Sequence, residues 1–242
     1  MQKTLYFPLF LSIAFILAGC EEPPDEPEPC LPVAGDVLLP IAEGNYWTSE
    51  QINWGDGQIE EGFEDTGKVV IEKMMTIQFE GTEYQVGVRN VHFPVDLKSD
   101  LNWLFWNGPD GLYFMGGVSS FDSLTTKVLQ LKYPVEVGES WMVPRMVYDG
   151  TFRVADTVAY VCVDTDAPYE TPLGTFQCVV YSYSIKPAED VLDLWHYFAY
   201  YAPGVGRVGT LIYSSPEAAY PYHSRDIFDL SWETILFDYC LK

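Results

Sequence analysis

Residue types that often carry chemistry are present in this chain, but their spacing matches no common catalytic or metal-binding pattern. The three histidines, His92, His196 and His223, are far apart in the sequence, and none belongs to a tight pair of metal ligands. No G-x-S-x-G segment is present, so the nucleophile turn of α/β-hydrolases is absent. The sequence therefore predicts no metal site and no cofactor, and it identifies no catalytic residue.

Two segments imitate known binding motifs. Residues 204–209 match G-x-G-x-x-G, but a dinucleotide site needs a helix after this motif, and residues 210–213 (Thr-Leu-Ile-Tyr) are typical of a strand instead. Residues 164–166 (Asp-Thr-Asp) offer carboxylates without the spacing of a calcium-binding EF-hand loop. We interpret the first segment as a turn and the second as solvated acidic surface.

Two aromatic segments are the best candidates for ligand contact. In residues 103–106 and 195–201, large rings fall on both faces of a predicted strand. Such a strand either lies between two layers of a core or lines a pocket with its second face. If a ligand exists, we expect the aromatic rings of these strands to stack on its sugar rings or to enclose its apolar tail. The acidic exterior argues against an anionic ligand. The candidate contact residues are Trp103, Trp106, Trp195 and Tyr200.

The segments around these residues have strand patterns. Apolar side chains mostly alternate with polar ones from Val69 to Phe79, a turn is expected at Glu80 and Gly81, and the alternation resumes from Tyr84 to Val88. No long segment has an apolar period of 3.6 residues. The sequence predicts an all-β protein with antiparallel hairpins.

An internal repeat organises the chain. Pro40–Trp47 and Pro134–Trp141 share the pattern P-[IV]-x-x-G-x-x-W at a spacing of 94 residues, because Trp141 follows Trp47 by 141 − 47 = 94 positions. Gly81-Thr82 and Gly174-Thr175 follow at nearly equal distances from the motif glycines. We predict two tandem β repeats, residues 38–131 and 132–225, with Trp47 and Trp141 equivalent and buried. Residues 226–242 form a C-terminal strand segment.

The N-terminal residues resemble the signal of a bacterial lipoprotein. Lys3 precedes the apolar run Leu5–Leu17, which is too short for a membrane-spanning helix. The run ends in Leu-Ala-Gly-Cys at residues 17–20, which resembles a lipobox. The resemblance implies cleavage after residue 19 and acylation of Cys20; the alternative is an ordinary secretory peptide with a chance cysteine.

The segment after Cys20 is expected to be a stalk. Residues 21–29 contain only Glu, Asp and Pro, and such a stretch cannot bury a core. We assign residues 20–37 to a lipidated, acidic and proline-rich stalk. The expected location is the cell envelope of a diderm bacterium, as an outer-membrane lipoprotein that faces the periplasm or the surface.

Four further cysteines are expected to form two disulfides, because an exported protein tolerates them and three pairings are possible. Two of them lie in β-rich runs joined by the turn-rich residues 164–174, and the other two lie near the ends of the folded part. The simplest pairing joins Cys162 to Cys178 and Cys30 to Cys240.

Three blocks of sequence resemble a broad group of uncharacterised bacterial lipoproteins. They are the P-[LIV]-x-x-G-x-x-W openings, Pro172–Cys178 and Tyr200–Val208. The resemblance implies curved antiparallel sheets or half-barrels, with no established activity and no catalytic residues.

The charge of the chain limits the classes of ligand that it can bind. With 13 Lys plus Arg against 35 Asp plus Glu, the formal charge of the 242-residue chain is −22, which excludes nucleic-acid binding. We expect a membrane-anchored, non-enzymatic protein that binds an apolar ligand, a glycan or an envelope protein through aromatic side chains. The alternative is an envelope hydrolase that acts on saccharides.

Overall fold

The structure, a computed structural model, describes residues 36–55, 58–60, 65–92, 101–185, 195–213 and 230–242. All regular structure in these ranges is β-strand, which confirms the predicted all-β class. Within the same ranges there is no helix long and apolar enough to cross a membrane. Residues 1–35, including Cys20 and Cys30, lie outside the described residues.

Thirteen strands form one antiparallel sheet in the described ranges. In chain order they are β1 (Tyr46–Gly55), β2 (Gln58–Ile59), β3 (Asp65–Phe79), β4 (Thr82–His92), β5 (Asn102–Gly108), β6 (Gly111–Val118), β7 (Ser123–Lys132), β8 (Ser140–Tyr148), β9 (Phe152–Thr171), β10 (Gly174–Ile185), β11 (Trp195–Ala202), β12 (Gly206–Tyr213) and β13 (Leu230–Cys240). The order in the sheet is β7-β6-β5-β4-β3-β1-β13-β12-β11-β10-β9-β8, and β2 pairs with β1.

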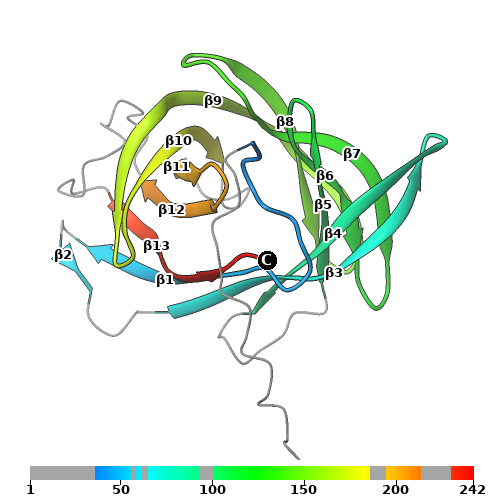
Figure 1. Ribbon diagram of the computed structural model, residues 1–242, viewed down its shortest axis with the longest axis horizontal. Helices are drawn as coiled ribbons and strands as arrows, with labels where there is room; N and C mark the ends of the chain where they lie inside the picture. The colour runs from blue at the N-terminus through cyan, green and yellow to red at the C-terminus, as the bar shows by residue number, and fades with distance from the viewer. Residues whose placement is uncertain (1–35, 56–57, 61–64, 93–100, 186–194, 214–229) are drawn as a thin grey trace, which may run out of the picture.

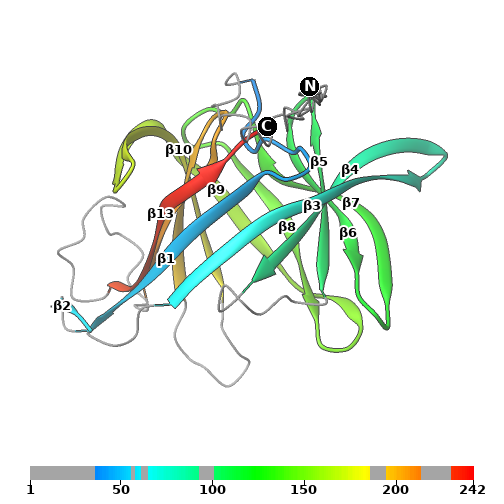
Figure 2. The ribbon, with the colours of Figure 1, turned by 60° about the horizontal axis from the view of Figure 1, so that its bottom comes forward.

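Two up-and-down runs of strands make up this order. One run extends from β1 to β7 and the other from β8 to β13, and they join where β1 pairs with β13 (Figures 1 and 2). The C-terminal strand therefore returns to the start of the fold. At the opposite end, β7 and β8 contact each other without a backbone ladder. The sheet is consequently a nearly closed, barrel-like structure with one seam.

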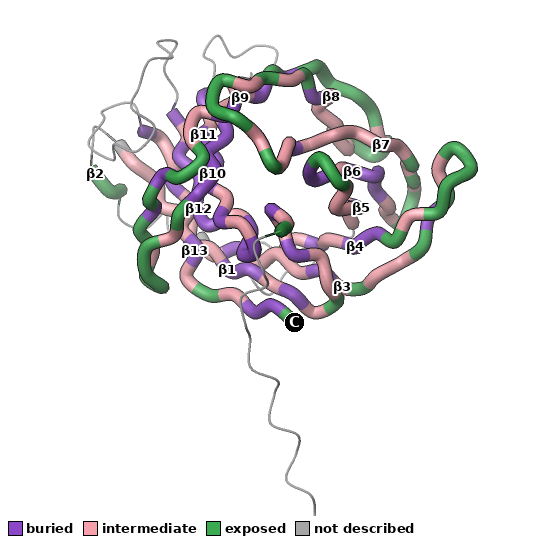
Figure 3. Tube along the Cα trace, turned by 45° about the horizontal axis from the view of Figure 1, so that its top comes forward, coloured by how far each residue is buried: buried purple, intermediate pink, exposed green. Residues whose placement is uncertain are grey.

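The hairpin between β3 and β4 follows the predicted alternation. Its turn lies at Glu80 and Gly81, as expected, and both residues have positive φ (50° and 77°). Positive φ at both central positions matches the right-handed twist of the flanking strands. Exposed residues gather at this tip, whereas Val86 and Val88 on β4 are buried (Figure 3).

The two copies of the glycine motif form turns with the same hydrogen bonds. Gly44 and Gly138 both have φ of 85°. The Gly44 amide donates to the Ile71 carbonyl, and the Gly138 amide donates to the Cys162 carbonyl, at 2.8 Å in each case. The amides of Ile71 and Cys162 donate back to the residue after each glycine, both at 2.9 Å. Superposition of the two complete repeats stays a prediction.

Buried side chains gather in three clusters. One consists mostly of residues of the second run, among them Tyr200 and Tyr213, and also includes Trp47 from β1 and Ile71 from β3. A smaller one lies within the first run: Ile77, Val86, Val88, Leu104 and Met115. The third lies between the two runs and includes Phe105, Phe114, Val143, Val158 and Tyr181. The sheet therefore curls enough for many strands to be covered on both faces.

The expected burial of both motif tryptophans is correct only for Trp47, which is 5% exposed and donates from Nε1 to the Val205 carbonyl at 2.5 Å. Trp141 is only half-buried, and its Nε1 donates to the Gln130 carbonyl at 3.4 Å. Trp141 lies on β8, the last strand of the sheet order, so fewer neighbours cover it.

The predicted disulfide between Cys162 and Cys178 is wrong, because both are free thiols. The residues between them are not a turn: β9 continues to Thr171, so Cys178 lies opposite Ala167 and Cys162 lies opposite Tyr181. Five residues of strand, roughly 16 Å, separate Cys162 from Ala167, whereas a disulfide needs Cα atoms within about 7 Å. The thiols also belong to different clusters.

Cys240 is disulfide-bonded. Its predicted partner, Cys30, lies outside the described residues, so that pairing stays a prediction.

Candidate ligand-binding cavity

A cavity of about 360 Å³ lies inside the barrel-like sheet. Every strand except β2 contributes at least one lining residue, so both runs of strands form its wall. Cavities that bind small molecules begin at roughly 300 Å³. The interior therefore has room for a small ligand.

Much of the wall is apolar and aromatic. Trp103 and Phe105 point inward from β5, two positions apart on one face of the strand, and Phe114 meets them from β6. The ring centroid of Phe114 lies 5.4 Å from that of Trp103 and 5.9 Å from that of Phe105. Further aliphatic residues complete this part of the wall: Leu39, Val69, Leu112, Leu131, Val143, Met146, Val158, Ile185, Val208 and Leu236.

Four aromatic rings stack across β8 to β11. Trp141, Tyr160, Tyr183 and Tyr197 occupy directly opposed register positions, with successive centroids 5.9, 4.5 and 4.7 Å apart. Tyr160 and Tyr183 border the cavity. Burial raises the pKa of both phenols, so they are neutral hydrogen-bonding groups at physiological pH.

Three arginines also border the cavity, and they differ in their partners. Arg145 on β8 donates from Nε and Nη2 to the Asp156 carboxylate at 2.7 and 2.9 Å, and this hydrogen bonding lowers the pKa of Asp156. Arg89 on β4 and Arg207 on β12 have no ion pair or hydrogen bond with any described residue.

Arg89 and Arg207 lie close enough to influence each other. Burial, followed by repulsion from Arg207, lowers the pKa of Arg89 to about 10. The guanidinium of Arg89 lies 5.5 Å from the Phe105 ring centroid. Tyr201 is the cross-strand neighbour of Arg207 and interacts electrostatically with Arg89. The two guanidiniums and the Tyr201 phenol thus belong to the polar part of the cavity wall, which also includes Ser49, Gln130, Arg145, Tyr160, Tyr183 and Thr234.

The described wall contains no Asp, Glu or His. This is unexpected in a chain with 35 acidic residues. A hydrolase with two catalytic carboxylates would need both of them at its substrate, and this cavity supplies neither among its lining residues.

Of the four aromatic residues predicted to contact a ligand, only Trp103 lines the cavity. Trp106 points to the other face of β5, where its ring and those of Tyr84 and Tyr113 surround Lys127 Nζ, 5.0 Å from each centroid.

The other two candidates pack within the fold. Trp195 packs edge-on against Trp232 with centroids 4.4 Å apart. Tyr200 is fully buried against Tyr169, at 4.3 Å.

The histidines do not meet in the described structure. His92 lies 3.9 Å from the Glu72 carboxylate, and His196 Nδ1 is 2.6 Å from Ser184 Oγ. Neither His196 nor Ser184 borders the cavity. His223 lies outside the described residues. No three His, Cys, Asp or Glu side chains gather into a possible metal site within the described ranges.

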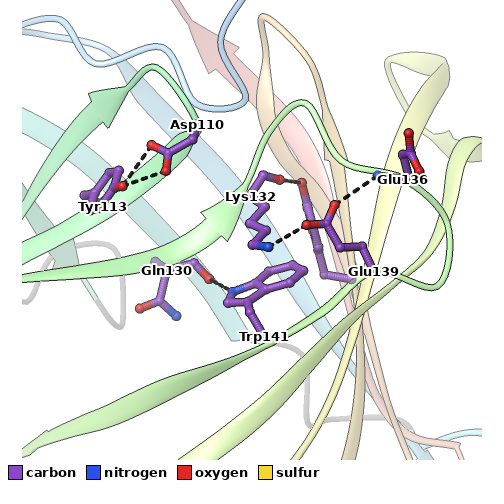
Figure 4. A network of polar contacts seen from close by, with 8 residues as sticks. Asp110, Tyr113, Gln130, Lys132, Glu136, Glu139 and Trp141 are labelled. Atoms are coloured by element: carbon purple, nitrogen blue, oxygen red, sulfur yellow. Dashed lines mark hydrogen bonds and ion pairs between the residues drawn. The ribbon is translucent and has the colours of Figure 1, made fainter.

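Side chains close the seam between β7 and β8 beside the cavity. Trp141 donates to the Gln130 carbonyl, Lys132 Nζ pairs with Glu139 Oε1 at 2.5 Å, and Glu139 also accepts from the Glu136 amide at 3.4 Å (Figure 4). Gln130 Nε2 donates to the Tyr160 hydroxyl at 3.1 Å. β7 and β8 are the two end strands of the sheet order, and these contacts join them in the absence of backbone pairing.

Sequence reasoning missed Arg89 and Arg207. Arg89 alternates with Val86 and Val88 in the usual manner of a cation on the solvent face of a strand. Only the curling of the sheet turns that face inward. Nothing in the local sequence distinguishes the two arginines from surface cations.

The comparisons with known proteins concern the fold. No protein family and no curated protein matches the chain. A candidate lipoprotein of Parabacteroides distasonis ATCC 8503 is structurally similar, with a TM-score of 0.47, 13% identity and coverage of 84% of this chain and 98% of its own. A candidate exported protein with a YmcC-like fold from Bacteroides fragilis NCTC 9343 has a TM-score of 0.46, 12% identity and coverage of 84% and 99%.

Proposed function

We propose that the protein is a lipid-anchored, non-enzymatic component of the cell envelope that holds a small, largely apolar ligand inside its sheet. The observation that carries this proposal is the cavity of about 360 Å³ with its apolar and aromatic wall. A wall of this kind contributes binding energy through burial of the ligand's apolar surface.

The cavity favours this function over the alternatives. A glycan needs many polar partners, and this wall is mainly aliphatic and aromatic. A saccharide hydrolase needs catalytic carboxylates, which the described wall lacks. A protein partner would use an outer surface, so its binding does not require the interior space.

Ligand uptake is testable with an uncharged fluorophore, N-phenylnaphthylamine, whose emission rises in apolar surroundings. The full chain carrying Cys20→Ser is used, so that neither acyl groups nor detergent compete for the probe. Val143 is 2% exposed and borders the cavity, whereas its neighbour Met142 is 61% exposed. We expect Val143→Trp to fill the cavity and weaken probe binding at least tenfold, and Met142→Trp to leave it unchanged.

Far-UV circular dichroism verifies that both variants fold, since overpacking destabilises a core by about 1–3 kcal/mol. The proposal is overturned if the parent protein does not bind the probe. It is also overturned if a folded Val143→Trp protein binds the probe as well as the parent does.

The membrane anchor is a separate part of the proposal and rests on the lipobox-like residues 17–20. Acylation at Cys20 would hold the protein at the outer membrane of a diderm bacterium, because several acyl chains give lasting membrane attachment. Cys20→Ala should abolish incorporation of labelled palmitate and move the protein to the soluble fraction. Undiminished labelling of this variant would contradict the assignment.

A further inference from the structure

From Arg89 and Arg207 we infer that the ligand is an anionic amphiphile whose acidic head binds between these two guanidiniums while its tail occupies the apolar part of the cavity. This inference rests on the proposed function and adds the chemical class of the ligand. It departs from the expectation, drawn from the acidic exterior, that argues against an anionic ligand.

Two partly buried cations without an anionic partner among the described residues are unusual. Removing a charge from water is unfavourable unless an opposite charge or several hydrogen bonds compensate for it. Arg89 and Arg207 have neither an ion pair nor a hydrogen bond with any described residue, and repulsion from Arg207 is one cause of the lowered pKa of Arg89. An anion between them would compensate both charges at once.

In the same wall, the third arginine has an acidic partner from the chain itself. Arg145 has a bidentate ion pair with Asp156. Carboxylates are abundant in the chain, yet none of the described ones borders the cavity beside Arg89 or Arg207. The missing anion must therefore come from outside the described fold.

The surroundings of the two guanidiniums suit an acidic head. Guanidinium groups bind carboxylates and phosphates with paired hydrogen bonds. Tyr201, opposite Arg207 in the sheet, and Tyr183 offer phenol hydroxyls in the same cavity. Arg89 comes from the first run of strands and Arg207 from the second, so an anion between them would also link the two halves of the fold.

The volume limits the size of the ligand. A cavity of about 360 Å³ lies near the lower end of the roughly 300–1,000 Å³ of small-molecule sites, so it suits a compact ligand. Decanoate, with a carboxylate on a ten-carbon chain, is a small probe of this kind. Decyl phosphate tests the other common acidic head, and decanol supplies the same tail without charge.

The test measures displacement of N-phenylnaphthylamine by these three probes from the full chain with Cys20→Ser. We expect decanoate or decyl phosphate to bind at least tenfold more tightly than decanol, and the better of the two identifies the preferred head. Arg89→Met and Arg207→Met should each weaken binding of that anion at least tenfold and leave decanol binding within twofold.

Arg153→Met is the matched control, because it removes the same charge from an exposed residue outside the cavity that pairs with Asp149. It should change none of the affinities. If decanol binds as tightly as both anions, or if Arg153→Met weakens anion binding as much as Arg89→Met, the inference fails and the proposed cavity function remains. If none of the three probes binds, the proposed function itself fails.

Discussion

At the scale of single residues, the arginine that we propose to bind the ligand lowers the stability of the ligand-free protein. Arg89 is partly buried beside Arg207, and burial together with repulsion from Arg207 lowers the pKa of Arg89 to about 10. Its pKa in the unfolded chain is higher, so below pH 10 Arg89 is charged in both states and the folded state bears the full desolvation penalty. The penalty decreases only as the pH rises above about 10.

Arg89→Met is therefore expected to stabilise the ligand-free protein at neutral pH. The gain should be about 1–3 kcal/mol after allowance for the lost contact with the Phe105 ring, which corresponds to a rise in Tm of several degrees for a chain of this size. Thermal unfolding at pH 7 and pH 9 measures it, and the gain should be equal at both values because both lie below pH 10. A lower Tm for Arg89→Met than for the parent would show that an internal partner compensates the guanidinium.

At the scale of strands and turns, much of the fold could be predicted. Alternation of apolar residues and the turn at Glu80 and Gly81 predicted the β3–β4 hairpin, because period-two patterns depend only on local geometry. The β9–β10 hairpin was mistaken for two short strands around a long turn. Ala167 and Tyr169 are buried while Asp166, Pro168 and Glu170 are exposed, so this segment also alternates. Its Asp and Pro residues concealed the pattern.

The repeated glycine turns lead to a prediction for two matched substitutions. Gly44 and Gly138 both have φ of 85°, a conformation that is unfavourable for residues with a side chain. Gly138→Ala should destabilise the protein by about 1–2 kcal/mol through backbone strain alone, since an added Cβ would have no neighbour within 4 Å.

Gly44→Ala should destabilise by a similar or slightly larger amount, because its Cβ would lie 3.0 Å from the flexible Lys242 side chain. Urea denaturation of both variants provides the comparison, and Gly81→Ala serves as an open, positive-φ reference in a different turn. A negligible effect of Gly138→Ala would mean that the backbone of this turn can relax, and that the two turns differ in how strictly they require glycine.

At the scale of the whole molecule, the candidate site could not be predicted, because it arises from closure. Trp103 was recognised from the aromatic pattern of its own strand. Arg89 and Arg207 lie 118 residues apart (207 − 89) on strands of different halves, and only long-range pairing such as that of β1 with β13 brings the halves together. The net acidic composition gave no information on the cavity, whose described lining residues include no carboxylate.

The same closure predicts that the ends of the folded part matter for stability. β13 pairs with β1 through positions such as Tyr46 and Cys240, and Cys240 is disulfide-bonded. If its partner is Cys30, the bond encloses almost the entire folded chain, and a loop of that length stabilises by roughly 2–5 kcal/mol in the chain-entropy account. Cys240→Ala should lower the midpoint of urea unfolding accordingly, and a reducing agent should have the same effect on the parent protein but none on the variant.

Cys162 and Cys178 provide the internal control, since both are free and burial raises their pKa values to about 11 and about 12. Peptide mapping without reduction should therefore yield one bridge, between Cys30 and Cys240, and two alkylatable thiols after unfolding. A bridge from Cys240 to any other cysteine would contradict the pairing. If neither Cys240→Ala nor reduction of the parent lowers the unfolding midpoint, the β1–β13 pairing, and not the disulfide, holds the two halves together.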